Sequence, residues 1–299
     1  MSEPSLLHEP VLLGESLRLL APIAGDTVLD ATVGLGGHAE AFLKAIGPSG
    51  TLIGLDADAR HLALAKERLV PLPGTLILHH TNFRDIAALS LPHCNIVFAD
   101  LGLCSAHIDD GERGFSFRTD APLDLRFDVS TGQSAASLIA SSTEQQLMDI
   151  LRRYGELQHV RRLAALLAKN TPATTAQLRV CVEESYGWRA PSFLPQVFQA
   201  FRIAVNDELG ALETFLNAVP FLLAAGGRWG MISFHSLEDR LVKRRFRDLT
   251  AHDRDTITGK RIGTPPFTAV TMKPVRASPE EVARNPRSRS ALLRVVQRV

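Results

Sequence analysis

Short apolar runs alternate with helical periods along much of this 299-residue sequence, and this alternation predicts a sheet covered by helices. The runs that are short enough to form single strands lie at 27–29, 51–55, 76–78, 96–99 and 229–234. Between the first three runs, segments 39–46 and 60–69 have helical spacing and end at Gly or Pro. Because a helix that connects two neighbouring strands of a sheet joins them in parallel, we expect an α/β fold with helices on both faces of the sheet.

The alternation stops between the fourth and fifth runs, where helical periods follow one another without a strand. Thr143–Gln146 has the form of a capping box and predicts the start of a helix. Further helical periods lie at 147–154, 160–167, 174–185 and 196–218, of which the last is the longest in the chain. The sequence therefore predicts a helical domain that is inserted between two strands of the sheet.

The inserted domain divides the sheet domain into two parts. We expect the first part in residues 1–108, the helical insertion in 109–199 and the second part in 200–299. Residues 251–290, rich in Arg, Pro and Thr, are expected to form an irregular tail on the surface. From Arg240 onwards, 15 Lys and Arg residues outnumber 5 Asp and Glu residues, although the whole chain has a net charge of only +1. A phosphate-rich partner and a solvated tail explain this basic end equally well.

Several other classes of protein are disfavoured by the sequence. The longest apolar stretch, near 218–225, is too short to cross a membrane and contains Pro220. The N-terminal segment carries Glu3 and Glu9 but no basic residue, unlike a secretory signal. The three cysteines show no C-x-x-C spacing, so we expect neither a disulfide framework nor a metal site. These features predict a cytoplasmic protein that is not attached to a membrane.

A glycine-rich loop follows the first predicted strand. Gly34, Gly36 and Gly37 lie between that strand and the next helix, where a ligand could approach backbone N–H groups. Gly34, Gly36 and Ala39 also fit the dinucleotide-binding pattern, and an acid near its ribose-binding position is Asp56. The loop alone therefore leaves open a nicotinamide dinucleotide or another adenosine-containing cofactor.

Polar and aromatic residues at the ends of the predicted strands separate these two cofactor types. Asp30 precedes the glycine loop and would repel a pyrophosphate, but it suits the cationic end of S-adenosylmethionine. Asp56 can accept hydrogen bonds from ribose hydroxyls, and Phe83 could lie against an adenine ring or belong to the core. We therefore favour S-adenosylmethionine as the cofactor.

Asp100 lies at the end of the fourth predicted strand, where methyltransferases that act on amino groups contact the target nitrogen. A carboxylate there can accept an N–H bond and help localise the nitrogen lone pair of an exocyclic amine. The aromatic residue that usually ends this motif is replaced by Leu103, so Phe115 or Phe117 could stack on an extruded base. A strand-end cap at Asp100 and core positions for the two Phe residues are the structural alternative.

Motifs that run nearly end to end make the chain resemble the bacterial 16S ribosomal RNA cytosine-N4 methyltransferase family. The most specific of them are RGFSF (113–117), VNDEL (205–209) and FHSLEDR (234–240). The others lie at 8–16, 30–38, 54–58, 82–83, 100–109, 123–128, 154–156, 198–209, 226–243 and 285–294. The resemblance implies a Rossmann-like methyltransferase sheet interrupted by a helical recognition domain. It also implies methylation of a decoding-region cytosine in the small ribosomal subunit.

The resemblance further implies which residues bind the cofactor, whereas the expected RNA contacts come from the aromatic and basic side chains themselves. Cofactor contacts are expected at the matching positions Gly36, Gly37, His38, Asp56, Phe83, Asp100 and His107, of which Asp100 is also the candidate catalytic residue. The family usually has Gln where this chain has His107, and its His-Pro-Ala-Thr-Arg segment is replaced by APSFL at 190–194. RNA contacts are expected at Phe115, Phe117, Arg244, Arg245, Arg287 and Arg289, in a monomer or a homodimer.

Two groups of polar residues have a structural as well as a functional interpretation. Ser236 with Asp239 could cap the next helix after His235 ends a strand, which we favour over a catalytic role. Arg202 with Asn206 could line the site or hold a helix in place. Two other functions also remain open: a ribosome-assembly factor that binds rRNA without catalysis, and an NAD-dependent dehydrogenase.

Overall fold

The computed structural model describes residues 10–104, 107, 110–254 and 261–299. The described chain forms two compact units: a core unit up to Gly102 and from Gly210 to Val299, and a helical unit from Leu103 to Leu209. The helical unit is longer than the predicted insertion of 109–199. It begins at Leu103, and at its other end helix α9 (Ala190–Asn206) continues past residue 199. In the described residues, no helix combines the length and the apolar character that crossing a membrane requires.

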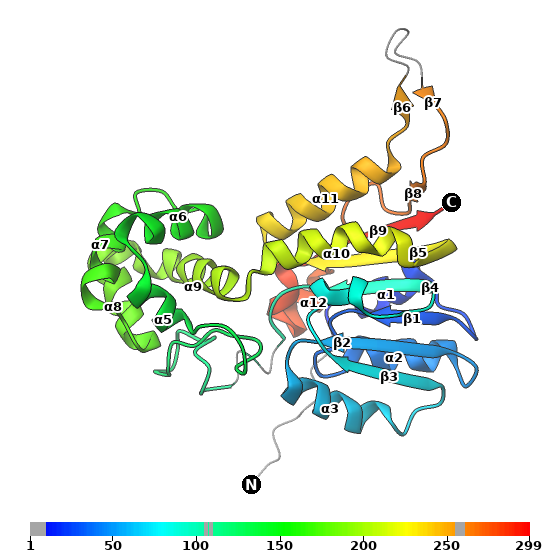
Figure 1. Ribbon diagram of the computed structural model, residues 1–299, viewed down its shortest axis with the longest axis horizontal. Helices are drawn as coiled ribbons and strands as arrows, with labels where there is room; N and C mark the ends of the chain where they lie inside the picture. The colour runs from blue at the N-terminus through cyan, green and yellow to red at the C-terminus, as the bar shows by residue number, and fades with distance from the viewer. Residues whose placement is uncertain (1–9, 105–106, 108–109, 255–260) are drawn as a thin grey trace. The chain divides into compact units, whose positions relative to one another are not determined.

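The core unit is built on a seven-stranded sheet with the strand order β3-β2-β1-β4-β5-β9-β8 (Figure 1). Its strands are β1 (Thr27–Asp30), β2 (Thr51–Asp56), β3 (Thr75–His80), β4 (Cys94–Asp100), β5 (Leu223–Ser233), β8 (Phe267–Ala269) and β9 (Leu292–Arg298). The strands β1 to β5 pair in parallel, whereas β9 and β8 are antiparallel. The predicted α/β sheet is therefore confirmed, and the insertion lies between β4 and β5.

Helices cover both faces of the sheet because alternate strand residues point to opposite sides. The helices of the core unit are α1 (Leu13–Leu20), α2 (Gly37–Ile46), α3 (Ala59–Leu69), α10 (Glu208–Leu222), α11 (Ser236–Thr250) and α12 (Pro279–Arg284), with short 3-10 turns η1 (Phe83–Ala88) and η3 (Pro286–Ser290). Apolar residues of α1, α2 and α3 pack with Val28 and Phe98, whereas those of α10 and α11 pack with Leu29 and Val97. This two-sided burial fixes the register of the sheet.

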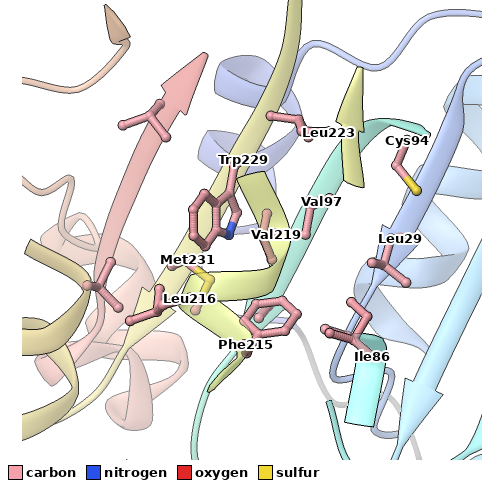
Figure 2. Close-up of a cluster of buried hydrophobic side chains, with 14 of the residues drawn as sticks. Leu29, Ile86, Cys94, Val97, Phe215, Leu216, Val219, Leu223, Trp229 and Met231 are labelled. Carbon is pink, nitrogen blue, oxygen red and sulfur yellow. The ribbon is translucent and has the colours of Figure 1, made fainter. Parts of the chain in front are cut away.

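Trp229 is at the centre of the apolar cluster under α10 and α11 (Figure 2). Its ring lies edge-on to Phe246 at 4.8 Å between ring centroids and to Phe215 at 6.3 Å. Phe215 from α10 in turn contacts the ring of Phe83 at 5.2 Å. This aromatic chain links η1, α10, β5 and α11 into one core.

The helical unit consists of five helices and the 3-10 turn η2 (Gly187–Arg189) within the described residues. The helices are α5 (Ala135–Ser141), α6 (Glu144–Gly155), α7 (Arg161–Asn170), α8 (Thr175–Tyr186) and α9. The predicted capping box at Thr143 is present. The Thr143 side chain accepts from the Gln146 N–H, and the Gln146 side chain accepts from the Thr143 N–H. Thr174 and Gln177 form a second capping box. The apolar faces of α6, α7, α8 and α9 meet in one core.

Two sequence predictions about local structure need correction. The single long helical period at 196–218 is two helices, α9 and α10, because Asp207 adopts a left-handed conformation with φ 47°. The basic tail is not irregular throughout: α12, η3 and β8 lie within 251–290, where β6 (Asp253–Arg254) and β7 (Arg261–Ile262) also pair. Residues 255–260 of that segment lie outside the described residues.

Candidate cofactor site

Three carboxyl side chains lie at one edge of the core sheet, each at the end of a parallel strand. Asp30 ends β1, Asp56 ends β2 and Asp100 ends β4. Because β1 pairs with both β2 and β4, the sheet brings the ends of these three strands together. Ligands of α/β sheets bind at this carboxyl edge. The three acids therefore mark the candidate site, which we call the carboxyl edge.

Asp30 is completely buried, and only one of its two carboxyl oxygens has a hydrogen-bond partner among the described residues. Its Oδ1 accepts from the Thr32 N–H at 3.1 Å, whereas Oδ2 is buried without a partner. Burial raises the pKa of Asp30 to about 7, the bond from Thr32 opposes this, and the charge of Asp56 adds to it. A buried oxygen of this kind is costly unless a ligand contacts it.

Asp100 is held in place by its backbone and by a neighbouring histidine. Its N–H donates to Oγ1 of Thr32 at 2.7 Å, and its Oδ2 lies 3.7 Å from Nδ1 of His38. Its Oδ1 is buried and has no hydrogen-bond partner within the described chain. Burial raises the pKa of Asp100 well above its usual range, and the charges of Asp30 and Glu238 contribute in the same direction.

His38 itself is buried between the sheet and the segment that precedes α1. Its Nε2 lies 3.0 Å from the carbonyl oxygen of Val11, and its ring lies 4.7 Å from the ring of Phe98. When Nε2 donates to this carbonyl, Nδ1 of the neutral ring faces Asp100 as an acceptor. The carboxyl group of Asp100 lies beside this ring, with Oδ2 3.7 Å from Nδ1.

The glycine loop is tied directly to Asp56. The Gly34 N–H donates to Oδ2 of Asp56 at 2.7 Å, and the Asp58 N–H donates to Oδ1 at 2.8 Å. Burial raises the pKa of Asp56 to about 6, although these two bonds oppose the change. Each oxygen keeps a further lone pair, so the carboxylate can still accept bonds from two hydroxyl groups.

The conformation of the loop explains its glycines. Gly36 immediately precedes α2 and has φ 82°, a left-handed conformation that other residues rarely adopt. A Cβ on Gly37 would lie 2.5 Å from Cγ of Pro10, closer than packing allows. The two glycines therefore allow the left-handed turn before α2 and the close packing of Pro10 against its first residue.

The charge of the carboxyl edge distinguishes the two cofactor types that the sequence left open. In the described part of the chain, no Lys or Arg forms an ion pair with Asp30, Asp56 or Asp100. A pyrophosphate would add negative charge to these three acids, whereas the ammonium and sulfonium groups of S-adenosylmethionine would neutralise them. The residues present therefore fit S-adenosylmethionine, and they fit a dinucleotide poorly.

Phe83 begins η1, a few residues after the end of β3. Its ring is half-buried, and one edge packs against Phe215. The preceding Asn82 caps η1 by accepting from the Arg84 N–H at 3.0 Å. Phe83 therefore belongs in part to the core while a portion of its ring stays accessible, and its contact with adenine stays a prediction.

His107, Phe115 and Phe117 lie in the helical unit. The ring of His107 is 5.0 Å from Phe115 and 5.1 Å from Phe127, and Phe115 stacks on Phe127 at 5.8 Å. Phe115 is only 6% exposed, so its ring is a core ring in this structure and is not presented for base stacking. Phe117 is half-buried and lies edge-on to Phe198. Motif residues 8–9, 105–106 and 108–109 lie outside the described residues.

The four arginines that the sequence assigned to RNA differ in their availability. Arg244, Arg287 and Arg289 are exposed. Arg245 is half-buried, and its Nε donates to the Leu216 carbonyl at 3.1 Å, which joins α11 to α10. Arg245 is therefore less available than the other three arginines, and its phosphate contact stays a prediction.

The polar motifs outside the carboxyl edge have structural roles. His235, and not Ser236, is the N-cap of α11, where it accepts from the Glu238 N–H while Glu238 accepts from the His235 N–H. Arg202 pairs with Glu208 through bonds of 2.7 and 2.9 Å. Asn206 accepts from the Phe127 N–H and donates to the Leu125 carbonyl, which fixes that loop on α9.

Replacing Asp56 with Ala is expected to weaken S-adenosylmethionine binding by roughly 10- to 100-fold, because hydrogen bonds to a charged group are lost. Isothermal titration calorimetry measures this change. Asp56→Asn keeps one acceptor oxygen, and we expect an intermediate affinity for it. Unchanged affinity in Asp56→Ala would contradict the assignment of this carboxylate to the ribose hydroxyls.

Comparison with known proteins relates this geometry to a family. A family model described as the MraW methylase family matches residues 5–299. "Ribosomal RNA small subunit methyltransferase H" of Nitratidesulfovibrio vulgaris (strain DSM 19637 / Miyazaki F) is 42% identical over 313 residues, which cover 98% of this chain and 86% of that protein. The protein of the same name from Thermomicrobium roseum is 42% identical over 312 residues, with 99% and 94% covered. A solved rRNA methylase from Streptococcus thermophilus is 10% identical with a TM-score of 0.44, and 99% of each chain is covered.

Proposed function

Because the chain belongs to the MraW methylase family, we propose that it methylates the exocyclic N4 amine of a cytosine in 16S ribosomal RNA. The methyl donor is S-adenosylmethionine, and the substrate is the decoding region of the small ribosomal subunit. The observation that supports this function most strongly is the carboxyl edge, where Asp30, Asp56 and Asp100 lie beside a glycine loop and form no ion pair with Lys or Arg in the described residues. We further propose that the enzyme acts in the cytoplasm as a monomer or a homodimer.

The residues of the core unit have distinct parts in cofactor binding. We assign the ribose hydroxyls to Asp56, the adenine ring to the accessible part of Phe83, and the cationic end to Asp30 and Asp100. Gly36 and Gly37 are retained as proposed cofactor contacts, and His38 positions Asp100. When bound, S-adenosylmethionine supplies an electrophilic methyl group on a positively charged sulfur. His107, in the helical unit, is retained as a proposed cofactor contact.

Asp100 is the residue that we assign to the chemistry. An exocyclic amine of cytosine is a weak nucleophile because its lone pair is delocalised into the ring. The unpartnered Oδ1 of Asp100 can accept one amine hydrogen, which favours a localised lone pair on nitrogen. The remaining requirement is alignment of the nitrogen with the methyl group, which binding of the base provides. Phe117 and the exposed Arg244, Arg287 and Arg289 are retained as proposed RNA contacts.

Replacing Cys104 with Ala is expected to leave the rate of methyl transfer largely unchanged. Methylation at an exocyclic nitrogen needs no covalent enzyme intermediate, whereas methylation at cytosine carbon 5 uses a nucleophilic cysteine. Cys104 is half-buried and is, of the three cysteines, the one nearest in sequence to Asp100. Near-total loss of activity, with an RNA adduct trapped on the wild-type thiol, would contradict this prediction.

Transfer of labelled methyl groups to small ribosomal subunits, taken from cells that lack this gene, tests the proposal. We expect label in the RNA with the wild-type chain and none when the chain is omitted. A non-catalytic assembly factor would bind the same subunits without transferring label. A dehydrogenase would bind NAD in calorimetry in preference to S-adenosylmethionine, and either outcome would overturn the proposed function.

A further inference from the structure

Helix α11 presents a row of cations on its exposed side. Arg240, Lys243, Arg244 and Arg247 are exposed and recur at helical spacing, so they lie on one face. The opposite side of the helix is buried through Val242 and Phe246, which pack in the core cluster around Trp229. We call these four residues the α11 basic face. With a rise of 1.5 Å per residue, the face extends over about 10 Å.

Acidic residues on the same helix do little to neutralise this face. Asp239 is paired with Arg294 of β9 through two bonds of 2.8 and 3.0 Å. Glu238 is buried and accepts from the Phe234 N–H. Asp248 is paired with the exposed Arg247, an interaction that solvent weakens. In the described residues, Lys243 and Arg244 have no acidic partner within ion-pair distance.

The α11 basic face begins beside the carboxyl edge. Strand β5 pairs with β4 so that Ile232 lies opposite Asp100, and α11 starts at Ser236, only a few residues after the end of β5. Arg240 is therefore about one helical turn from the start of α11, and the other three cations follow in the direction of β6 and β7 (Figure 1). A chain of negative charges that reaches the carboxyl edge could continue along this helix.

We propose that the α11 basic face binds the phosphate backbone of the RNA strand whose base is methylated; this inference rests on the proposed function. Lys and Arg side chains neutralise phosphates and release counterions, and within this face Lys243 and Arg244 have no acidic partner at ion-pair distance in the described residues. The face carries no aromatic side chain, so it positions the RNA backbone without reading base sequence. It also lacks exposed apolar residues, which distinguishes it from an amphipathic helix that inserts into a membrane surface.

The double variant Lys243→Ala/Arg244→Ala tests this inference in the full-length protein. We expect its affinity for small ribosomal subunits to fall about tenfold, while its affinity for S-adenosylmethionine stays at the wild-type value. For single-stranded RNA each neutralised phosphate contributes about 0.7 to the slope of log affinity against log salt. The slope, measured over a series of KCl concentrations, should therefore decrease by about 1.4 in magnitude.

A matched control removes two exposed cations from other helices of the core unit, Arg18→Ala in α1 and Lys66→Ala in α3. This control should keep both the wild-type affinity for the subunits and the wild-type salt slope. An equal loss in both double variants would show an effect of net charge alone and would overturn the inference. Wild-type affinity and a wild-type salt slope in the α11 variant would also overturn the inference. In that case methyl transfer by the wild-type chain would still support the proposed function. If the wild-type chain neither binds nor methylates the subunits, both fail.

Discussion

Replacing Asp100 with Asn is expected to lower the rate of methyl transfer at saturating cofactor by roughly 10²- to 10⁴-fold, the usual contribution of a positioned acid or base. The amide matches the carboxyl in shape, and its backbone bond to Thr32 is unaffected. However, the negative charge that the unpartnered Oδ1 of Asp100 directs at the target amine would be lost. Single-turnover transfer of label to small ribosomal subunits measures the effect.

Asp26→Asn is the matched control for this substitution. Asp26 precedes β1 at the opposite edge of the sheet, where its side chain accepts from the Ile23 N–H at 2.9 Å. An amide oxygen can accept the same bond, so we expect wild-type rates in the control. A rate in Asp100→Asn within the range of this control would contradict the assignment of Asp100 to the chemistry.

Replacing Asp30 with Asn is expected to change how the stability of the cofactor-free protein depends on pH. The folded pKa of Asp30, about 7, lies above the ordinary Asp value of 3.8, so the folded state binds more protons than the unfolded state between these values. Stability therefore falls as pH rises through this interval, by up to about 4 kcal/mol from Asp30. Asp30→Asn removes this contribution, so its free energy of unfolding should decrease less between about pH 4 and pH 8.

Urea unfolding followed by the fluorescence of Trp229 measures this difference. Trp229 is buried in the core unit, and the Trp188→Phe background removes the exposed tryptophan of the helical unit. The same variant should bind S-adenosylmethionine more weakly, because a negative charge that faces the cationic ligand is lost. Identical pH dependence in the wild-type and variant proteins would contradict the view that Asp30 is held as a costly buried acid.

The parallel part of the fold was predictable from the sequence, whereas its antiparallel edge was not. The first four strands are bounded by Gly, Pro or polar residues, and their helices end at Gly or Pro, so local patterns suffice. Strand β9 instead forms through pairing with β5, some 60 residues away in sequence. The break between α9 and α10 was missed because Asp207 changes the backbone direction without interrupting the apolar period.

The candidate site was predictable where it depends on strand ends. Asp30, Asp56 and Asp100 follow from the order of the strands, and the glycines follow from the loop that joins β1 to α2. Thr32 was missed because its bond to the Asp100 N–H joins β1 and β4 across 68 positions of sequence. Phe115 was expected at the RNA because sequence alone does not distinguish a buried ring from an exposed one. The internal hydrogen bond of Arg245 was likewise not visible in the sequence.

Nucleoside analysis of the methylated RNA tests the central claim most directly. Small ribosomal subunits from cells that lack this gene are incubated with the full-length chain and labelled S-adenosylmethionine, and the RNA is then digested to nucleosides. The carboxyl edge and the proposed role of Asp100 predict label in N4-methylcytidine. Label in 5-methylcytidine or in a ribose-methylated nucleoside, or no label while the cofactor still binds, would contradict the account.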